Sequence, residues 1–126
     1  MKTVINTNNA PAPIGPYSQA IVAGGFLFVS GQIPINPATG ELVLDDIKAE
    51  TKQVMENIKA ILVAAGVDFI NIVKTSIFLK DMQNFTQVNE VYGTYFTGEY
   101  PARETVQVAG LPKNVNVEIT VTAILN

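Results

Sequence analysis

The sequence predicts an α+β fold in which one six-stranded mixed sheet carries two helices on a single face. Two segments repeat their apolar residues at the period of a helix, and the other ordered segments resemble strands. The elements follow one another in the order β-β-β-α-β-α-β-β, which places both helices against one layer of sheet. A chain of 126 residues has the length of one domain, so we expect a single domain over 1–126.

The first part of the chain is predicted to contain a β-hairpin. SQAIVAGGFLFVS contains two apolar, β-branched segments on either side of Gly24 and Gly25. Glycine accepts the positive φ angles of a two-residue hairpin turn, so the turn is placed at this pair. The next segment, PINPATGE, has two prolines and a glycine and is predicted to be a loop.

A first helix is predicted from Ile47, where the apolar period changes to about 3.6 residues. Asp45 or Asp46 can cap its start, and Gly66 suits the left-handed position just past its end. The residues of its apolar stripe are Ile47, Thr51, Val54, Ile58, Ile61, Leu62 and Ala65.

NIVKTSIFLK, which follows, is β-branched and predicted to be a strand. DMQNFTQVNEVYGTYF is predicted to be a second helix, with Asp81 as its N-cap and with Gly93 weakening it without ending it. The residues expected on its buried face are Met82, Phe85, Val88, Tyr92 and Phe96. Two strands, near 103–109 and 116–124, complete the sheet.

The last strand predicts which face of the sheet the helices cover. In VNVEITVTAIL the odd-numbered positions are apolar and the even-numbered positions are polar, so we expect the odd set under the helices. Glu118 then lies on the helix-free face. In the preceding strand, Val106 and Val108 are assigned to the helix side. The residues this leaves on the helix-free face are Arg103, Thr105 and Gln107.

Arg103 and Glu118 are therefore expected on the same face, in direct reach if their strands are neighbours and roughly 10 Å apart if one strand intervenes. One interpretation is a structural ion pair. The other is a site in which the guanidinium binds a substrate carboxylate through parallel donors while the glutamate positions or activates a water. The spacing alone leaves both interpretations open.

Composition limits the chemistry that is available. The chain has no cysteine and no histidine, which excludes Ser-His-Asp, Cys-His and histidine-ligated zinc chemistry. A net charge of −3 without a basic cluster argues against nucleic acid and anionic membranes as partners. Only 15% of the residues are charged, which suggests that part of the surface is an interface.

No apolar run approaches the roughly 18–20 residues of a membrane span. The N-terminal MKTVINTNNAP lacks the apolar region of a signal peptide, so a cytoplasmic location is expected.

Four further polar positions are candidates for the site. Tyr17 could supply a ring wall and a hydroxyl or could simply pack in its loop. Ser30 and Gly31 could present a hydroxyl and a backbone N–H to a carboxylate or could form a plain turn. Asn89 is expected to make a capping or inter-subunit hydrogen bond.

Several segments together resemble the RidA family of reactive intermediate imine deaminases, also called YjgF-like proteins. They are APAPIGPYSQA, VSGQIPINPATGEL, IVKTSIFLKDM, VNEVYGTYF and PARETVQVAGLPKNVNVEI, and they cover nearly the whole chain. The last is the family's signature region. The chain departs from many members at Thr105, which is often cysteine, at Glu104, which is often a small residue, and at Gly110, which is often basic.

The resemblance implies a chorismate-mutase-like fold assembled as a homotrimer, with sites in the clefts between subunits. It also implies hydrolysis, without cofactor or metal, of 2-iminopropanoate and 2-iminobutanoate to the 2-keto acid and ammonia. These imines arise from enamines such as 2-aminoacrylate, which PLP-dependent dehydratases release. A non-catalytic module that binds small keto or amino acids is the competing class of function. The acidic balance and the lack of histidine argue against older family labels of ribonuclease activity.

The resemblance also assigns roles to individual positions. The family arginine that binds the substrate carboxylate falls on Arg103, and the glutamate linked to the hydrolytic water falls on Glu118. The positions that the resemblance implies as lining the substrate site are Tyr17, Ser30, Gly31, Asn89 and Thr105.

Overall fold

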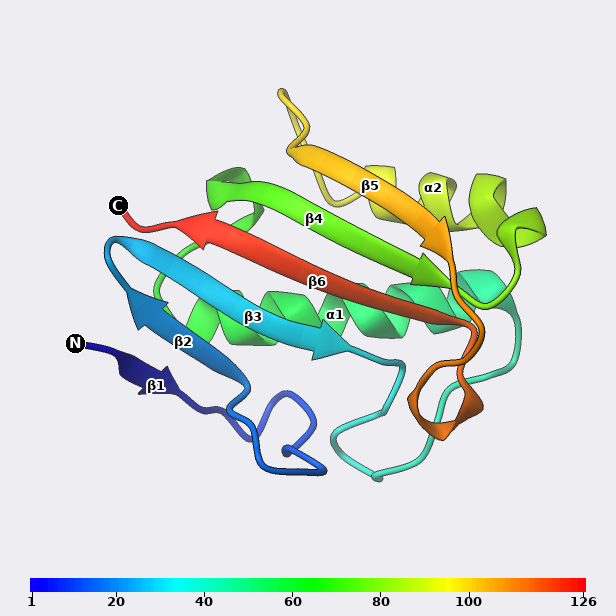
Figure 1. Cartoon of the computed structure of the whole chain (residues 1–126), viewed down its shortest axis with the longest axis horizontal. Helices are drawn as coiled ribbons and strands as arrows, with labels where there is room; N and C mark the ends of the chain where they lie inside the picture. Colours follow the sequence, from blue (N-terminus) through cyan, green and yellow to red (C-terminus); the bar gives the residue numbers. More distant parts are fainter.

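Six strands form one sheet in the spatial order β1-β2-β3-β6-β4-β5, and both helices cover the same face of it (Figure 1). The computed structural model describes all residues 1–126. The strands are β1 (Thr3–Ile5), β2 (Ala20–Ala23), β3 (Phe26–Gln32), β4 (Ile72–Leu79), β5 (Ala102–Gln107) and β6 (Val117–Ile124). Neighbouring strands are antiparallel except β4 and β5, which are parallel, so the sheet is mixed. The predicted α+β class and element order are confirmed.

Local sequence signals set the ends of α1 (Ile47–Ala64) and the turn between β2 and β3. Gly24 and Gly25 have φ angles of 59° and 83°, as the hairpin turn requires. The Asp46 carboxylate caps α1 by accepting a hydrogen bond from the Ala49 N–H at 2.8 Å. Gly66 has a φ of 78°, the left-handed conformation predicted just beyond the helix.

The second helix is shorter than predicted. A 3₁₀ turn (η2, Met82–Asn84) precedes α2 (Phe85–Gly93), and Asp81 caps the 3₁₀ turn through the N–H of Gln83. The expectation that the helix continues past Gly93 was wrong, because α2 ends there. Glycine costs a helix about 1 kcal/mol relative to alanine. Beyond it the chain continues in i→i−3 bonds, such as the one from the Phe96 N–H to the Gly93 carbonyl.

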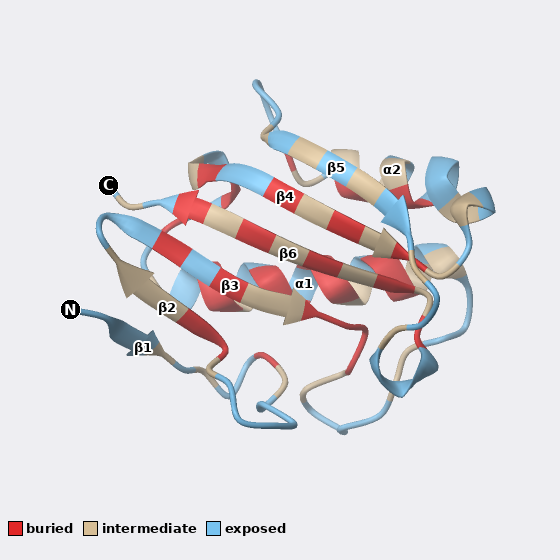
Figure 2. Cartoon of the chain, viewed as in Figure 1, coloured by how far each residue is buried: buried red, intermediate tan, exposed pale blue.

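The core lies between the helices and the central strands, which Figure 2 shows as bands of buried residues along β4 and β6. The odd-numbered residues of β6 point to the helices, as predicted. They are Val117, Ile119, Val121 and Ala123, and none is more than 2% exposed. Two 3₁₀ turns, η1 (Phe69–Asn71) and η3 (Pro112–Asn114), lead into β4 and β6. Neither helix combines the length and the hydropathy needed to cross a membrane.

The predicted orientation of β5 was wrong. Arg103 pairs with Thr75 of β4, and Thr75 pairs with Val121, whose side chain is under the helices. Arg103 therefore lies on the helix side, and so does Thr105, because side chains alternate along a strand. Val106 takes the helix-free face.

Glu118 lies on that helix-free face, so Arg103 and Glu118 point to opposite sides of the sheet, with β4 between their strands. The alternation was misleading because β5 is an edge strand. The layer beside it on the helix side holds aromatic rings that accommodate a guanidinium, instead of an aliphatic core.

Candidate active site

Arg103 lies beneath α2, held by one hydrogen bond and two aromatic rings. Its Nη1 donates to Oδ1 of Asn89 at 2.7 Å. The guanidinium carbon is 5.1 Å from the ring centre of Tyr92 and 5.7 Å from that of Phe85, distances at which a cation is attracted to a ring face. Residues four and three apart on a helix share a face, so the spacing 85, 89 and 92 directs all three side chains at Arg103.

Tyr92 is itself fixed by a second hydrogen bond. Its hydroxyl pairs with the Thr75 hydroxyl at 2.8 Å, and Thr75 is only 1% exposed. Burial raises the pKa of Tyr92 above its ordinary value, although the Thr75 hydrogen bond and the charge of Arg103 act in the opposite direction. The ring therefore stays neutral and presents its face to the guanidinium.

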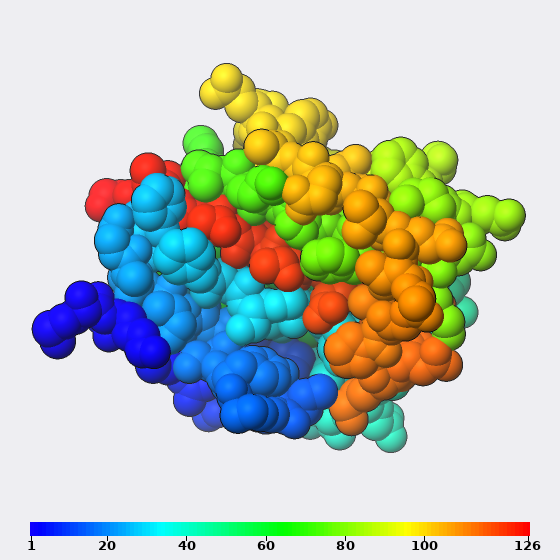
Figure 3. All heavy atoms as spheres, in the orientation of Figure 1, coloured from blue at the N-terminus to red at the C-terminus, as the bar shows by residue number.

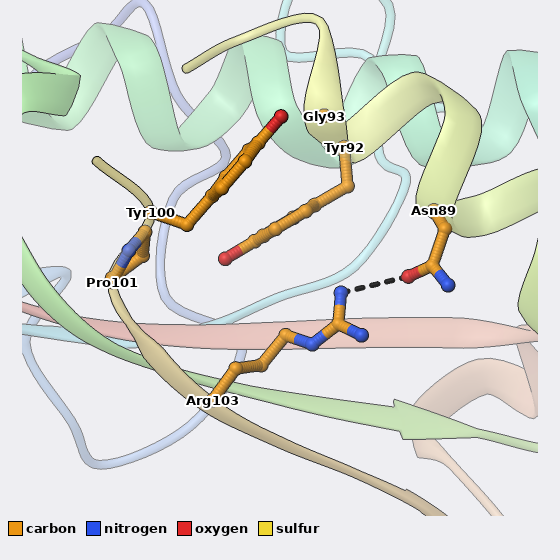
Figure 4. Close-up of a pocket in the computed structure, with 6 residues that line it drawn as sticks. All are labelled: Asn89, Tyr92, Gly93, Tyr100, Pro101 and Arg103. Atoms are coloured by element: carbon orange, nitrogen blue, oxygen red, sulfur yellow. Dashed lines mark hydrogen bonds between the residues drawn. The ribbon is translucent and has the colours of Figure 1, made fainter. Parts of the chain in front are cut away.

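A cavity of about 340 Å³ opens beside Arg103. Its lining residues are Asn89, Tyr92, Gly93, Tyr100, Pro101 and Arg103 (Figure 4). Neither salt bridge of the chain involves Arg103, and only Nη1 of its nitrogens is engaged in a hydrogen bond. A guanidinium has five N–H donors, so Arg103 retains the capacity to bind an added carboxylate or phosphate through two parallel bonds.

A second group of predicted residues gathers around Glu118 on the other face. Gly31 lies so close that a Cβ added there would be 2.5 Å from Oε2 of Glu118. Ser30 donates from Oγ to the Ser18 carbonyl at 2.6 Å, which ties the segment carrying Tyr17 to the end of β3. Figure 3 shows the face that the helices leave uncovered, with this N-terminal segment in blue bordering the cyan strand β3.

Glu118 is partly buried and has no cationic partner. Burial raises the pKa of its carboxyl above the ordinary value of 4.5, because a carboxylate loses hydration there. A carboxyl with a raised pKa holds a proton more strongly than an ordinary glutamate does, which brings it closer to the range useful for proton transfer near neutral pH.

Glu50 fixes the backbone that carries Glu118. This carboxylate, on α1, is 1% exposed. It accepts hydrogen bonds from the backbone N–H of Asn116 at 2.6 Å, from that of Val117 at 3.1 Å and from the Asn116 amide at 2.9 Å. The start of β6 is thus tied to α1 by three hydrogen bonds to one buried side chain.

Within one chain the predicted site residues divide into two half-sites. The first half-site comprises Asn89, Arg103 and Thr105. The second comprises Ser30, Gly31 and Glu118, and the segment that carries Tyr17 is tied to it through the Ser18 carbonyl. Thr105 is two residues from Arg103 along β5, and its buried hydroxyl has no hydrogen-bond partner in the chain. The sheet separates the two half-sites, so a single chain does not bring Arg103 and Glu118 together.

Sequence reasoning missed Glu50, Thr75 and the contact of the Tyr92 ring with the Arg103 guanidinium. Glu50 carried a readable signal, because it falls one turn before Val54 in an otherwise apolar stripe. Tyr92 was assigned to the core, and the three-residue spacing from Asn89 is the pattern that links it to Arg103. No comparable signal marked Thr75, whose importance comes from strand pairing.

The two-helix, six-stranded mixed sheet places this molecule in the class of Rid-type α+β proteins. The solved structure of YyfA from Yersinia pestis, of the conserved Rid protein family, is 54% identical and superposes with a TM-score of 0.97 over 99% of this chain and 100% of that one. The family model described as Endoribonuclease L-PSP matches residues 7–125. The chain belongs to this family, and the resemblance to RidA proteins is confirmed.

Two further relatives have informative names. The 2-iminobutanoate/2-iminopropanoate deaminase of Mus musculus is 48% identical over 124 residues, covering 98% of this chain and 92% of the mouse protein. The structure of Escherichia coli TdcF with bound serine is 42% identical and has a TM-score of 0.94, covering 98% of this chain and 99% of TdcF.

Proposed function

We propose that the protein hydrolyses small 2-imino acids, such as 2-iminopropanoate and 2-iminobutanoate, to the 2-keto acid and ammonia. The observation that carries the proposal is Arg103, a guanidinium fixed by Asn89 and Tyr92 that has free donors beside a cavity. The deaminase name of the mouse relative and the bound serine of TdcF, a small amino acid with a carboxylate, support the same ligand class.

The chemistry follows from the two half-sites. Arg103 binds the substrate carboxylate and so fixes the position of the C=N carbon. Water attacks that carbon as Glu118 accepts a proton from it, and a C–O bond forms. Glu118 then returns the proton to the nitrogen and the C–N bond breaks, its electron pair leaving with ammonia. The hydroxyl proton passes to Glu118 as the C=O bond of the keto acid forms. A protonated imine is already electrophilic, so this route needs no cofactor.

The complete site forms between copies of the chain in this proposal. Arg103 and Glu118 face opposite sides of one sheet, so one chain cannot direct both groups at one imine. In a homotrimer, Arg103, Asn89 and Thr105 of one subunit meet Glu118 and Gly31 of the next. Exposed apolar side chains on the uncovered face, such as Phe28 and Val106, suit burial in such an assembly.

The test combines two variants that are inactive alone. Arg103→Ala and Glu118→Gln should each lose imine hydrolysis, measured by coupling a threonine dehydratase to the protein and following decay of the transient imine. Co-expressed in equal amounts, they should regain about a quarter of wild-type activity, because each seam receives one intact Arg103 and one intact Glu118 with that probability.

The double variant Arg103→Ala/Glu118→Gln is the control. Co-expressed with either single variant it should remain inactive, because one of these mixtures has no Arg103 and the other has no Glu118. No recovery in the mixed single variants would show that the two groups do not act from neighbouring subunits. Binding of 2-oxobutanoate that is lost in Arg103→Ala and kept in Glu118→Gln, without imine hydrolysis by the wild type, would instead assign the competing function of a non-catalytic carboxylate-binding module.

A further inference from the structure

Strand β3 contains a β-bulge at residues 30–31, in the second half-site. The register of β3 on β6 changes between two pairs, Val29 with Val121 and Gln32 with Ile119. Between these pairs β3 has one residue more than β6. Bulges bend a strand, interrupt its hydrogen-bond ladder and often occur next to active sites. The bulged residues therefore need support that the regular ladder does not provide.

The bulge brings the main chain of β3 against the Glu118 carboxylate. A Cβ added to Gly31 would be 2.5 Å from Oε2, 2.9 Å from Cδ and 3.1 Å from Cγ of Glu118. Burial raises the pKa of this carboxyl. No neighbouring charge offsets it, because β3 has no titratable side chain, and Lys74 and Lys80, on and just after β4, are paired with other side chains. The burial of Glu118 thus depends on where the bulge holds Gly31.

Every polar group of Ser30 is engaged in holding the bulge. Its N–H donates to the Gln19 carbonyl at 3.0 Å, and its Oγ donates to the Ser18 carbonyl at 2.6 Å. Its own carbonyl accepts a hydrogen bond from Nε2 of Gln32 at 3.1 Å. The bulge is therefore fixed by the segment 18–19 through two bonds and by the Gln32 amide through a third.

Gln32 occupies a position in the core. It pairs with the fully buried Ile119, and it is itself only 6% exposed. The earlier residues of β3 on this side of the sheet are Leu27 and Val29. A buried amide costs free energy that an apolar side chain does not. Core packing thus gives no reason for glutamine at this position, whereas the hydrogen bond to the bulge carbonyl does.

We propose that Gln32 is a positioning residue for the hydrolysis, whose amide holds the bulge that sets Gly31 against the Glu118 carboxylate. Gln32 does not touch the substrate and acts through the place it gives to Glu118. The inference rests on the proposed function for its reaction, but the titration of Glu118 tests it without turnover. All the contacts lie within one chain, so they do not depend on how subunits assemble.

Gln32→Met removes the donor and keeps an unbranched side chain. Because a misplacement of 1 Å costs on the order of 100-fold in rate, kcat for 2-iminobutanoate should fall about tenfold or more. In a Gly31→Ala background, where the added Cβ already displaces Glu118, Gln32→Met should change kcat by less than about twofold, since two changes that act through one group are not additive. A wild-type kcat in Gln32→Met, or an equal fall in both backgrounds, overturns the proposal.

Thr51→Val is the matched control. It removes the hydroxyl of a fully buried side chain that donates to the Ile47 carbonyl within α1. It should lower the thermal unfolding temperature and leave kcat unchanged, which separates a loss of stability from a loss of positioning.

Carbon-13 NMR of the Glu118 carboxyl supplies a readout that needs no turnover, and Glu118→Gln identifies the signal by its loss. The pKa of Glu118 should fall toward 4.5 in Gln32→Met, because water reaches the carboxylate once the bulge loosens, and should keep its wild-type value in Thr51→Val. An unchanged titration in Gln32→Met overturns the positioning role.

A wild type that hydrolyses no imine, with the titration shifted as expected in Gln32→Met, refutes only the proposed function. If circular dichroism shows that Gln32→Met does not fold, Gln32→Asn takes its place. Its amide is shorter by a methylene group and does not reach the Ser30 carbonyl, so the same fall in kcat and in the pKa of Glu118 is expected.

Discussion

Gly31→Ala offers a sharp test of Glu118 because it moves the carboxylate without removing it. The added Cβ would lie 2.5 Å from Oε2 of Glu118, and ordinary contacts begin at 3.4 Å. The carboxylate must therefore retreat by about 0.9 Å. Misplacement of a reacting group by 1 Å costs on the order of 100-fold in rate, which corresponds to about 2.7 kcal/mol in the activation free energy.

The expected result is a roughly 100-fold lower kcat for imine hydrolysis with the fold preserved. Gly31 has no positive φ angle, so alanine fits its backbone, and the atoms that must move are the flexible end of a side chain. The assay pairs turnover with thermal unfolding. Gly110→Ala is the control, since nothing lies within 4 Å of its added Cβ. Wild-type turnover in Gly31→Ala would refute the role of Glu118 at its observed position.

Two further predictions concern stability. Burial raises the pKa of Glu118 above 4.5, because the folded state disfavours the ionised carboxylate. The wild type therefore loses stability as the pH rises above 4.5 and Glu118 ionises. Glu118→Gln should therefore unfold at a higher temperature than wild type at pH 7 and at the same temperature below pH 4.5; a constant difference across pH would contradict this reasoning. Glu50→Ala leaves three N–H donors without their acceptor and should lower the free energy of unfolding by about 2–4 kcal/mol in urea titrations, with the exposed Glu99→Ala as the control. A loss below about 0.5 kcal/mol would show that water replaces the carboxylate.

The sequence was sufficient to predict the element order, the hairpin turn, the α1 cap and the buried face of β6, because each depends on local signals or on a strong alternation. The faces of β5 could not be predicted in the same way. Its alternation places Arg103 and Val106 on opposite sides, but it does not reveal that a cation can lie toward the helices when Phe85 and Tyr92 provide ring faces.

Pairs that are distant in the sequence were also beyond sequence reasoning. Thr75 on β4 pairs with Tyr92 on α2, 17 positions further along the chain, a contact that no local pattern encodes. The polar tie from Glu50 to β6 joins residues 66 and 67 positions apart. The helical period of the apolar residues assigns Glu50 to the buried face of α1. Its hydrogen-bond partners become visible only in the folded structure.

The placement of Arg103 and Glu118 on opposite faces of one sheet has a consequence for regulation by concentration. A solitary chain carries both chemical groups but no complete reaction centre, so under the proposed arrangement its catalytic power exists only after assembly. A ligand that touches two chains at a seam strengthens their association by mass action. Substrate would then help to build the enzyme that consumes it, and scarce protein would be idle although fully folded.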